Sequence, residues 1–359
     1  MFTLVAMESP KPKITWKTLL FPLLGLVAFF LYIYLFKVDI FAIIDTAKTA
    51  NPLIFAVAVG CGLLEVLFYA VSWQSLTKHL NIKMTIKKAY LYLWYSLYVD
   101  ILVPAESISG EVVRTYLLTR DKCGSFGKIV ASLFTHRLLG MTMNVVILIL
   151  GVALLSFEVQ VPTAVFNIII FVAAAITAIT AVLTIMSFKK SVTLKIVNWI
   201  TKITTKLSLG KWTLSKFQTH ALETTDHFHD AMIEFRRNRK PLVQSLFYLG
   251  VTWFFSLSLP YLVFWSLGHP ASWSVILVTA AIVLAVKSIP VGIPFEVGLP
   301  EATMTTLYFS MGISVELAAT ATTLTRIITL WFRFLIGFLA QQYIELKPVI
   351  APECKDGKN

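Results

Sequence analysis

Charged residues are scarce in this sequence. Asp, Glu, Lys and Arg make up 14% of its 359 residues, whereas hydrophobic residues make up 57% and the mean hydropathy is +0.78. Soluble globular domains carry roughly 25% charged residues and a smaller apolar share. This composition excludes an ordinary soluble domain and indicates a chain that lies mostly in lipid.

Cysteines are few, and the common metal and nucleotide motifs are missing. Cys61, Cys123 and Cys354 are far apart and lack the spacing of a disulfide framework or a zinc site. The sequence contains no phosphate-binding glycine loop, dinucleotide fingerprint, zinc-protease motif or nucleophile elbow. His227 and His229 would lie about 200° apart on a helix, which does not suit one shared metal ion. We therefore expect no metal and no cofactor.

Long apolar runs fill most of the chain. The runs 17–36, 161–188 and 241–267 each exceed the roughly 20 residues needed to cross a hydrocarbon core. The first run is bulky and no small-residue cleavage site follows it, so we expect it to persist as an anchor. The pattern predicts an all-α, polytopic membrane helical bundle with about six full spans. These spans are 17–36, 52–76, 129–155, 161–188, 241–267 and 317–345.

Lysines and arginines border the apolar runs, which is typical of a topology signal. Lys11 and Lys13 precede the first span, eleven basic residues lie within 189–240, and Lys347 follows the last span. Because such residues stay on the cytoplasmic side, we expect a multi-pass protein of the cell membrane with both termini in the cytoplasm. This accounts for the net charge of +12, so nucleic acid is not an expected partner. The sequence leaves homo-oligomers open.

Two segments, 88–120 and 271–312, are interrupted by residues that break helices. The first has basic residues on both sides, so both of its ends are expected in the cytoplasm. The second has almost no flanking charge, which suits the outer side. Each is therefore predicted to form a re-entrant helical hairpin. The breaking residues are Pro104, Gly110, Pro294 and Gly298.

The two hairpins share an acidic pattern, P-x-E-x4-E. Its glutamates are Glu106 and Glu111 in the first copy and, 190 residues later, Glu296 and Glu301 in the second. Because the copies enter from opposite sides, we expect an inverted repeat, an arrangement typical of transporters. Repeat A covers about 86–155 and repeat B about 271–345, within one domain over 1–359.

Eleven acids and bases lie in or beside the membrane segments. At roughly 3 kcal/mol each in lipid they would cost about 30 kcal/mol, so they must face the interior, pair or line water. One ion pair is predicted in each repeat, Glu111 with Arg137 and Glu301 with Arg326. The alternative stays open that these pairs only lock the hairpins in place.

Three other features have structural interpretations. His136 is expected to make a hydrogen bond that packs helices together, and Trp73 is expected in an interfacial aromatic belt. The segment 189–240 has apolar residues at helical spacing among lysines, which predicts a basic amphipathic linker on the anionic leaflet. A solvated helical linker is the alternative.

At the hairpins the sequence resembles the lysylphosphatidylglycerol synthase transmembrane-region family, the flippase-like part of the multiple peptide resistance factor. The stretches that carry the resemblance are LVPAESISGEVVRTYLLTR (102–120), HRLLG (136–140), IPFEVGLPEATMTTLYFSMGIS (293–314) and LTRIITLWFRFLIGF (324–338). The first family motif falls on Pro104, Gly110, Glu111 and Arg114, and the second on Pro294, Gly298 and Glu301.

The sequence also departs from this family. Phe295 and Glu296 replace the paired glycines of the second motif, and the first glycine is spaced differently. We therefore expect a substrate other than the lysyl-lipid. No segment resembles the soluble aminoacyl-transferase domain of the full-length factor, so lipid aminoacylation is not expected.

The pattern and the resemblance favour a flippase-like lipid translocase, which moves an anionic or phosphate-bearing lipid through a polar path between the hairpins. Guanidinium groups bind phosphate by paired hydrogen bonds, and glutamates pair with them in the empty state or change protonation during transport. Two alternatives stay open: an integral membrane enzyme on a lipid or polyprenyl phosphate, with Glu106 and Glu111 as acid and base, and an accessory membrane subunit. The predicted substrate-binding residues are Glu106, Glu111, Arg114, Arg137, Glu296, Glu301 and Arg326.

Overall fold

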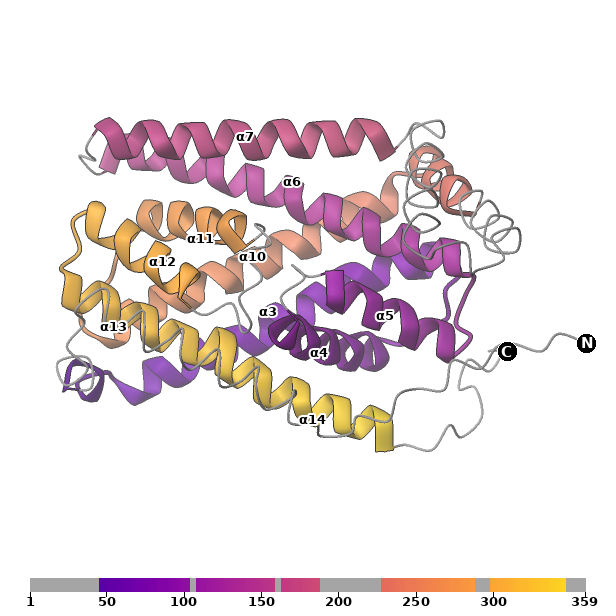
Figure 1. Cartoon of the computed structure of the whole chain (residues 1–359), viewed down its shortest axis with the longest axis horizontal. Helices are drawn as coiled ribbons and strands as arrows, with labels where there is room; N and C mark the ends of the chain where they lie inside the picture. Colours follow the sequence, from indigo (N-terminus) through magenta and orange to yellow (C-terminus); the bar gives the residue numbers. More distant parts are fainter. Residues whose placement is uncertain (1–44, 104–107, 159–162, 188–226, 288–297, 347–359) are drawn as a thin grey trace, which may run out of the picture.

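The computed structural model describes residues 45–103, 108–158, 163–187, 227–287 and 298–346 (Figure 1). Within these ranges every regular element is a helix, as the sequence predicts. The longest helices run side by side along the long axis of the molecule, and shorter helices fill the space between them.

Four helical runs in the described part of the chain are long and apolar enough to cross a membrane. They are α3 (Pro52–His79), α6 (Phe126–Glu158), α10 (Lys240–Ser266) and the continuous run of α13 (Val315–Arg326), η2 (Ile327–Phe332) and α14 (Arg333–Leu346). These runs match four of the predicted spans to within a few residues.

The predicted total of six spans is not reached within the described residues. The helix α7 (Thr163–Ser187) occupies the predicted span 161–188, and it contains the shorter apolar helix Ile169–Val182. The predicted span 17–36 lies outside the described residues.

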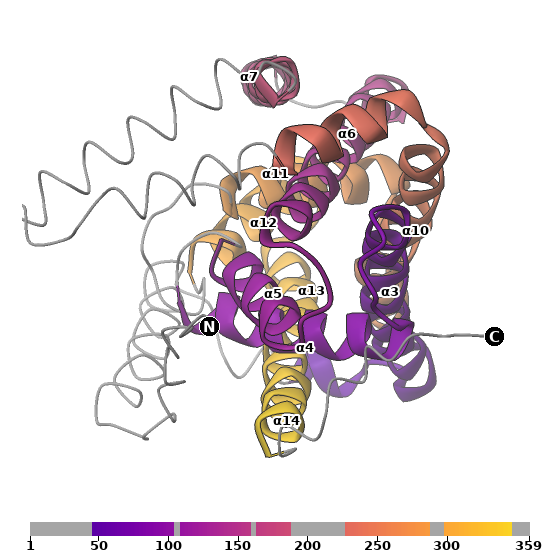
Figure 2. The ribbon, with the colours of Figure 1, turned by 90° about the vertical axis from the view of Figure 1, so that its right-hand side faces the viewer.

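The helices α3 and α10 pack against each other in opposite directions. At the start of α3, the side chain of Asn51 accepts hydrogen bonds from the backbone N–H groups of Leu53 and Ile54, which caps the helix. The backbone N–H of Asn51 donates to the carbonyl of Ser266, at the end of α10, over 2.7 Å. Figure 2 shows the pair on one side of the bundle.

The first predicted hairpin is formed by α4 (Ile86–Leu102) and α5 (Ile108–Arg120). At its closed end, the carboxylate of Asp100 on α4 accepts a hydrogen bond from the backbone N–H of Gly110 on α5. At its open end, the Tyr92 hydroxyl donates to Asp121, just after α5. The two helices are therefore antiparallel neighbours.

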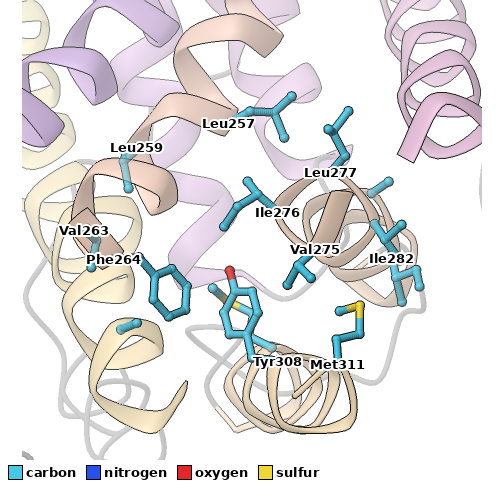
Figure 3. Close-up of a cluster of buried hydrophobic side chains, with 14 of the residues drawn as sticks. Leu257, Leu259, Val263, Phe264, Val275, Ile276, Leu277, Ile282, Tyr308 and Met311 are labelled. Atoms are coloured by element: carbon cyan, nitrogen blue, oxygen red, sulfur yellow. The ribbon is translucent and has the colours of Figure 1, made fainter. Parts of the chain in front are cut away.

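The second predicted hairpin is formed by α11 (Trp273–Lys287) and α12 (Leu299–Ser310). Figure 3 shows Val275 and Ile276 near the start of α11 facing Tyr308 and Met311 at the end of α12. These buried side chains pack with Phe264 of α10, whose ring centroid is 4.9 Å from that of Tyr308. This apolar cluster holds the second hairpin against the long helices.

The two repeats contact each other reciprocally. Gly337 on α14, in repeat B, lies so close to α4 of repeat A that an added Cβ would be 2.6 Å from the Trp94 carbonyl oxygen. Gly151 on α6, in repeat A, also lies close to α11 of repeat B, where an added Cβ would be 2.9 Å from the Cβ of Leu277. Each of these long helices thus packs on the first helix of the hairpin in the other segment.

The first hairpin lies against the second half of the run Val315–Leu346. At its open end, Arg120 donates to Glu345 over 3.5 Å, close to the end of α14. At its closed end, Ile101 packs on Leu330 of η2. The hairpin therefore reaches only about halfway along this long run.

The second hairpin lies against the other half of the same run. Thr305 of α12 donates to Thr322 of α13 over 3.3 Å, and Glu301 at the start of α12 reaches Arg326 at the end of α13. The inner ends of both hairpins therefore meet at the level of η2. Figure 1 shows α4 and α5 toward one end of the molecule and α11 and α12 toward the other.

One end of the bundle gathers most of the basic residues of the described chain, and we term it the basic end. The loops there touch, since the backbone N–H of Lys83 donates to the carbonyl of Cys123 over 3.0 Å. The residues at this end are Lys78, Lys83, Lys87, Lys88, Arg120, Lys122, Lys128, Arg236, Arg237, Arg239 and Lys240. At the opposite end, the described loops carry one lysine, Lys48.

Part of the predicted linker 189–240 belongs to the bundle. Residues 227–237 form a helix whose Ala231, Met232 and Phe235 are buried among the side chains of the basic end. These three apolar side chains pack into the core, whereas the predicted amphipathic linker on the anionic leaflet stays a prediction. The apolar residues on which that expectation rested lie outside the described residues.

Candidate functional site

Both predicted ion pairs are confirmed. Arg137 Nη1 on α6 lies 3.2 Å from Glu111 Oε1 on α5, and Arg326 Nε on α13 lies 2.5 Å from Glu301 Oε1 on α12. Each pair joins the second helix of a hairpin to the long helix that follows it in the same repeat. The two repeats therefore place equivalent charges in equivalent contacts.

The two pairs differ in burial. The side chains of Glu301 and Arg326 are 3% and 8% exposed, whereas those of Glu111 and Arg137 are 24% and 29% exposed. Glu301 also accepts from the backbone N–H of Gly298 over 2.7 Å, which caps α12. Gly298 has a φ of 99°, so it sits at the break where the sequence places it. The repeat B pair is closed in, and the repeat A pair is accessible.

Arg114 is the most informative of the predicted site residues. It is 5% exposed, and its guanidinium carbon lies 5.1 Å from the ring centroid of Trp73 on α3. Its Nε and Nη1 atoms are buried and have no hydrogen-bond partner among the described residues. Buried donors of this kind are costly unless something accepts from them.

Trp73 does not lie in an interfacial belt. Its side chain is fully buried, and its indole N–H donates to Ser132 of α6 over 3.4 Å. The prediction was wrong because Trp73 faces the inside of the bundle, where its ring supports the guanidinium of Arg114.

Gly110 does not break a helix, contrary to the prediction. It lies inside α5, after the break, and an added Cβ would be 2.2 Å from an Asp100 oxygen and 2.9 Å from the Ser96 carbonyl oxygen. Asp100 accepts from the Gly110 backbone N–H and from the Ser109 hydroxyl, each over 2.6 Å. Gly110 therefore permits a close approach between the two helices of the hairpin.

Tyr69 and His136 complete the surroundings of Arg114. His136 Nε2 lies 3.2 Å from the Ser72 hydroxyl, which bonds to Ser245 of α10, so the predicted packing hydrogen bond is confirmed. The ring centroids of Tyr69 and His136 are 4.4 Å apart. Tyr69 lies one turn before Trp73 on the same face of α3, so it neighbours the contact between Trp73 and Arg114.

A third ion pair lies between α3 and α14. Arg333 Nη2 donates to Glu65 Oε2, and the two side chains are 18% and 15% exposed. Arg326 and Arg333 are seven residues apart and would share one face of a straight α-helix. They flank η2, whose wider turn is found often at functional sites.

Polar side chains also join the elements at the basic end. Asp121 accepts from Tyr92 and from Lys88, whose Nζ is 3.2 Å away. Burial alone would raise the pKa of Asp121, but these hydrogen bonds and the charges of Lys88 and Arg120 together lower it below the usual value. This cluster fixes the open end of the first hairpin.

Four predicted site residues lie outside the described residues: Pro104, Glu106, Pro294 and Glu296. Within the described ranges no three His, Cys, Asp or Glu side chains gather closely enough to hold a metal ion. The substrate-binding role of all seven predicted residues stays a prediction.

The helices and their buried charges define a class, a multi-pass α-helical membrane protein with ion pairs inside its helical bundle. The chain belongs to the family of the lysylphosphatidylglycerol synthase TM region, which it matches over residues 21–337. The family predicted from the hairpin motifs is thereby confirmed.

Relatives of similar length are known as UPF0104 membrane proteins. One from Pyrococcus horikoshii is 24% identical over 289 residues, which cover 79% of this chain and 84% of that protein. One from Methanocaldococcus jannaschii is 23% identical over 339 residues, 93% of this chain and 97% of that protein. One from Methanothermobacter thermautotrophicus is 21% identical over 305 residues, 83% and 88% of the two chains.

Proposed function

We propose that this protein is a lipid translocase, which moves a lipid with an anionic or phosphate-bearing headgroup across the bilayer. The observation that carries the proposal is Arg114, a buried guanidinium with two donors that no described residue satisfies. A phosphate or carboxylate accepts from such a fork by two parallel hydrogen bonds. The family name, which refers to a lipid, is in keeping with this substrate class.

The distribution of charge supports one orientation. The basic end carries the residues that the positive-inside rule assigns to the cytoplasm, whereas the described loops at the opposite end carry only Lys48. In this orientation α4 and α5 enter from the cytoplasm and return, and α11 and α12 do the same from outside. Both would be re-entrant hairpins of an inverted repeat in a cell membrane.

The meeting of the hairpins at η2 supports a path through the middle of the membrane. Ionisable side chains at this depth face the interior of the bundle or a water-filled cavity. The accessible pair Glu111–Arg137 lies on the same helices as Arg114 and His136. Arg137 gives an arriving anion a second cation, and Glu111 neutralises that cation when no anion is bound.

Reconstitution tests the proposal directly. The purified protein is placed in liposomes with one of three lipids that carry a fluorescent label on the hydrocarbon chain: phosphatidylglycerol, phosphatidic acid or a polyprenyl phosphate. Dithionite then quenches the label on the outer leaflet. We expect the protein to speed the loss of inner-leaflet label for at least one of these lipids relative to empty liposomes. Mass spectrometry of the extracted lipids should show the starting mass only.

Two results contradict the proposal. If none of the three lipids crosses faster than in empty liposomes, the protein is not a translocase of this class. If a product of new mass forms in step with the loss of the labelled lipid, the protein is an enzyme on a lipid or polyprenyl phosphate, and the glutamates act as acid and base.

A further inference from the structure

One face of α3 joins Arg114 to the third ion pair. Glu65, Tyr69 and Trp73 follow one another at four-residue intervals, so they form a continuous stripe on that helix. Trp73 supports Arg114, and Glu65 accepts from Arg333. The stripe therefore runs from one arginine to the other over about 12 Å, the rise of eight helical residues.

The stripe runs from the level of the first hairpin toward the middle of the membrane. Trp73 lies six residues from the basic end of α3, whereas Glu65 lies at the midpoint of Pro52–His79. Arg333 begins α14, directly after η2, where the two hairpins meet. Phe334, beside Arg333, packs at the closed end of the first hairpin with Ile101. Arg333 is thus placed deeper than Arg114 and beside the hairpin junction.

The chemistry of the stripe suits a moving anion. Tyr69 lies between the two arginines, and its hydroxyl can donate to a phosphate oxygen that leaves one guanidinium for the other. Glu65 keeps Arg333 neutralised while no anion is present, so the pair can persist in a medium of low dielectric constant. Arg333 differs from Arg114 in having a carboxylate partner that an anion must displace.

We propose that Arg333 is a second binding position for the lipid phosphate, reached from Arg114 along the stripe Glu65–Tyr69–Trp73, and that Glu65 is its resting counter-ion. This inference rests on the proposed translocase function. Arg114 captures the headgroup, and Arg333 binds it during its passage past the hairpin junction. Loss of the second position should then slow translocation and leave capture intact.

Paired variants separate this role from a structural one. Glu65→Gln/Arg333→Gln removes both charges and keeps polar groups of the same size, and the exchange Glu65→Arg/Arg333→Glu keeps the pair but moves the cation onto α3. Arg239→Gln, at an exposed position of the basic end, is the control that replaces an arginine outside the stripe by the same residue. Thermal unfolding in detergent shows whether each variant is folded.

With the labelled lipid that the unchanged protein translocates fastest, we expect both double variants to bind it in detergent within about twofold of the unchanged protein. We expect them to translocate it about tenfold more slowly or worse, the loss that follows one charge-assisted hydrogen bond. Arg239→Gln should match the unchanged protein in both assays. Normal translocation by either folded double variant overturns the inference, because the pair would then serve only the fold. If the unchanged protein translocates none of the three labelled lipids, the proposed function fails instead.

Discussion

At the scale of single residues, the interior is organised by the pairing of charges, and Arg114 departs from that rule. Glu301 and Glu65 each bond to an arginine, whereas two donor atoms of Arg114 have no acceptor among the described residues. The two ion pairs could be predicted because the spacing between glutamate and arginine is nearly the same in both segments, 26 residues from Glu111 to Arg137 and 25 from Glu301 to Arg326. The contacts of Asp100 and Trp73 could not be predicted, because these contacts depend on which face of α4 and of α3 turns toward the inside of the bundle.

The two repeat pairs should differ in their effect on stability. Glu301→Gln removes the buried carboxylate that Arg326 Nε contacts and should cost about 3 kcal/mol, whereas Glu111→Gln in the more exposed pair should cost less than about 1 kcal/mol. Thermal unfolding of both variants in the same detergent checks this order. Equal losses would show that Glu111 is as enclosed as Glu301.

At the scale of elements, close contacts between helices fix the hairpins. Gly337 brings α14 against α4, and Gly151 brings α6 against α11. The bounds of the long helices could be predicted from hydropathy, since four of the predicted spans agree with the structure. The role of Gly110 was misjudged because a glycine near a break in a sequence pattern does not reveal whether it makes the break or accommodates a neighbour.

Gly337→Ala should loosen the contact between α14 and α4. The added Cβ would meet the Trp94 carbonyl oxygen at 2.6 Å and the Cβ of Tyr98 at 2.7 Å, so backbone must shift and about 1–3 kcal/mol should be lost. Gly60→Ala is the matched control, because nothing lies within 4 Å of its added Cβ and alanine favours the helix. Unfolding temperatures that fall equally in both variants would contradict a close contact at Gly337.

At the scale of the whole molecule, the two hairpins and the long helices pack on one another in matching ways. Each hairpin covers half of the run Val315–Leu346, and each long helix packs on the first helix of the other repeat. The inverted repeat stays a prediction, which rests on the acidic pattern that both hairpins share in the sequence. The packing of residues 227–237 into the core could not be predicted, since a basic segment with apolar residues at helical spacing is equally typical of a surface helix.

The translocation rate of Arg114→Gln in liposomes tests the central claim most directly. With the lipid that the unchanged protein moves fastest, we expect the variant to bind and translocate at least about tenfold less well, because the headgroup loses its charge-assisted donors. Arg239→Gln, which removes a positive charge from an exposed position, should keep the full rate. A folded Arg114→Gln protein that translocates at the full rate would contradict the account.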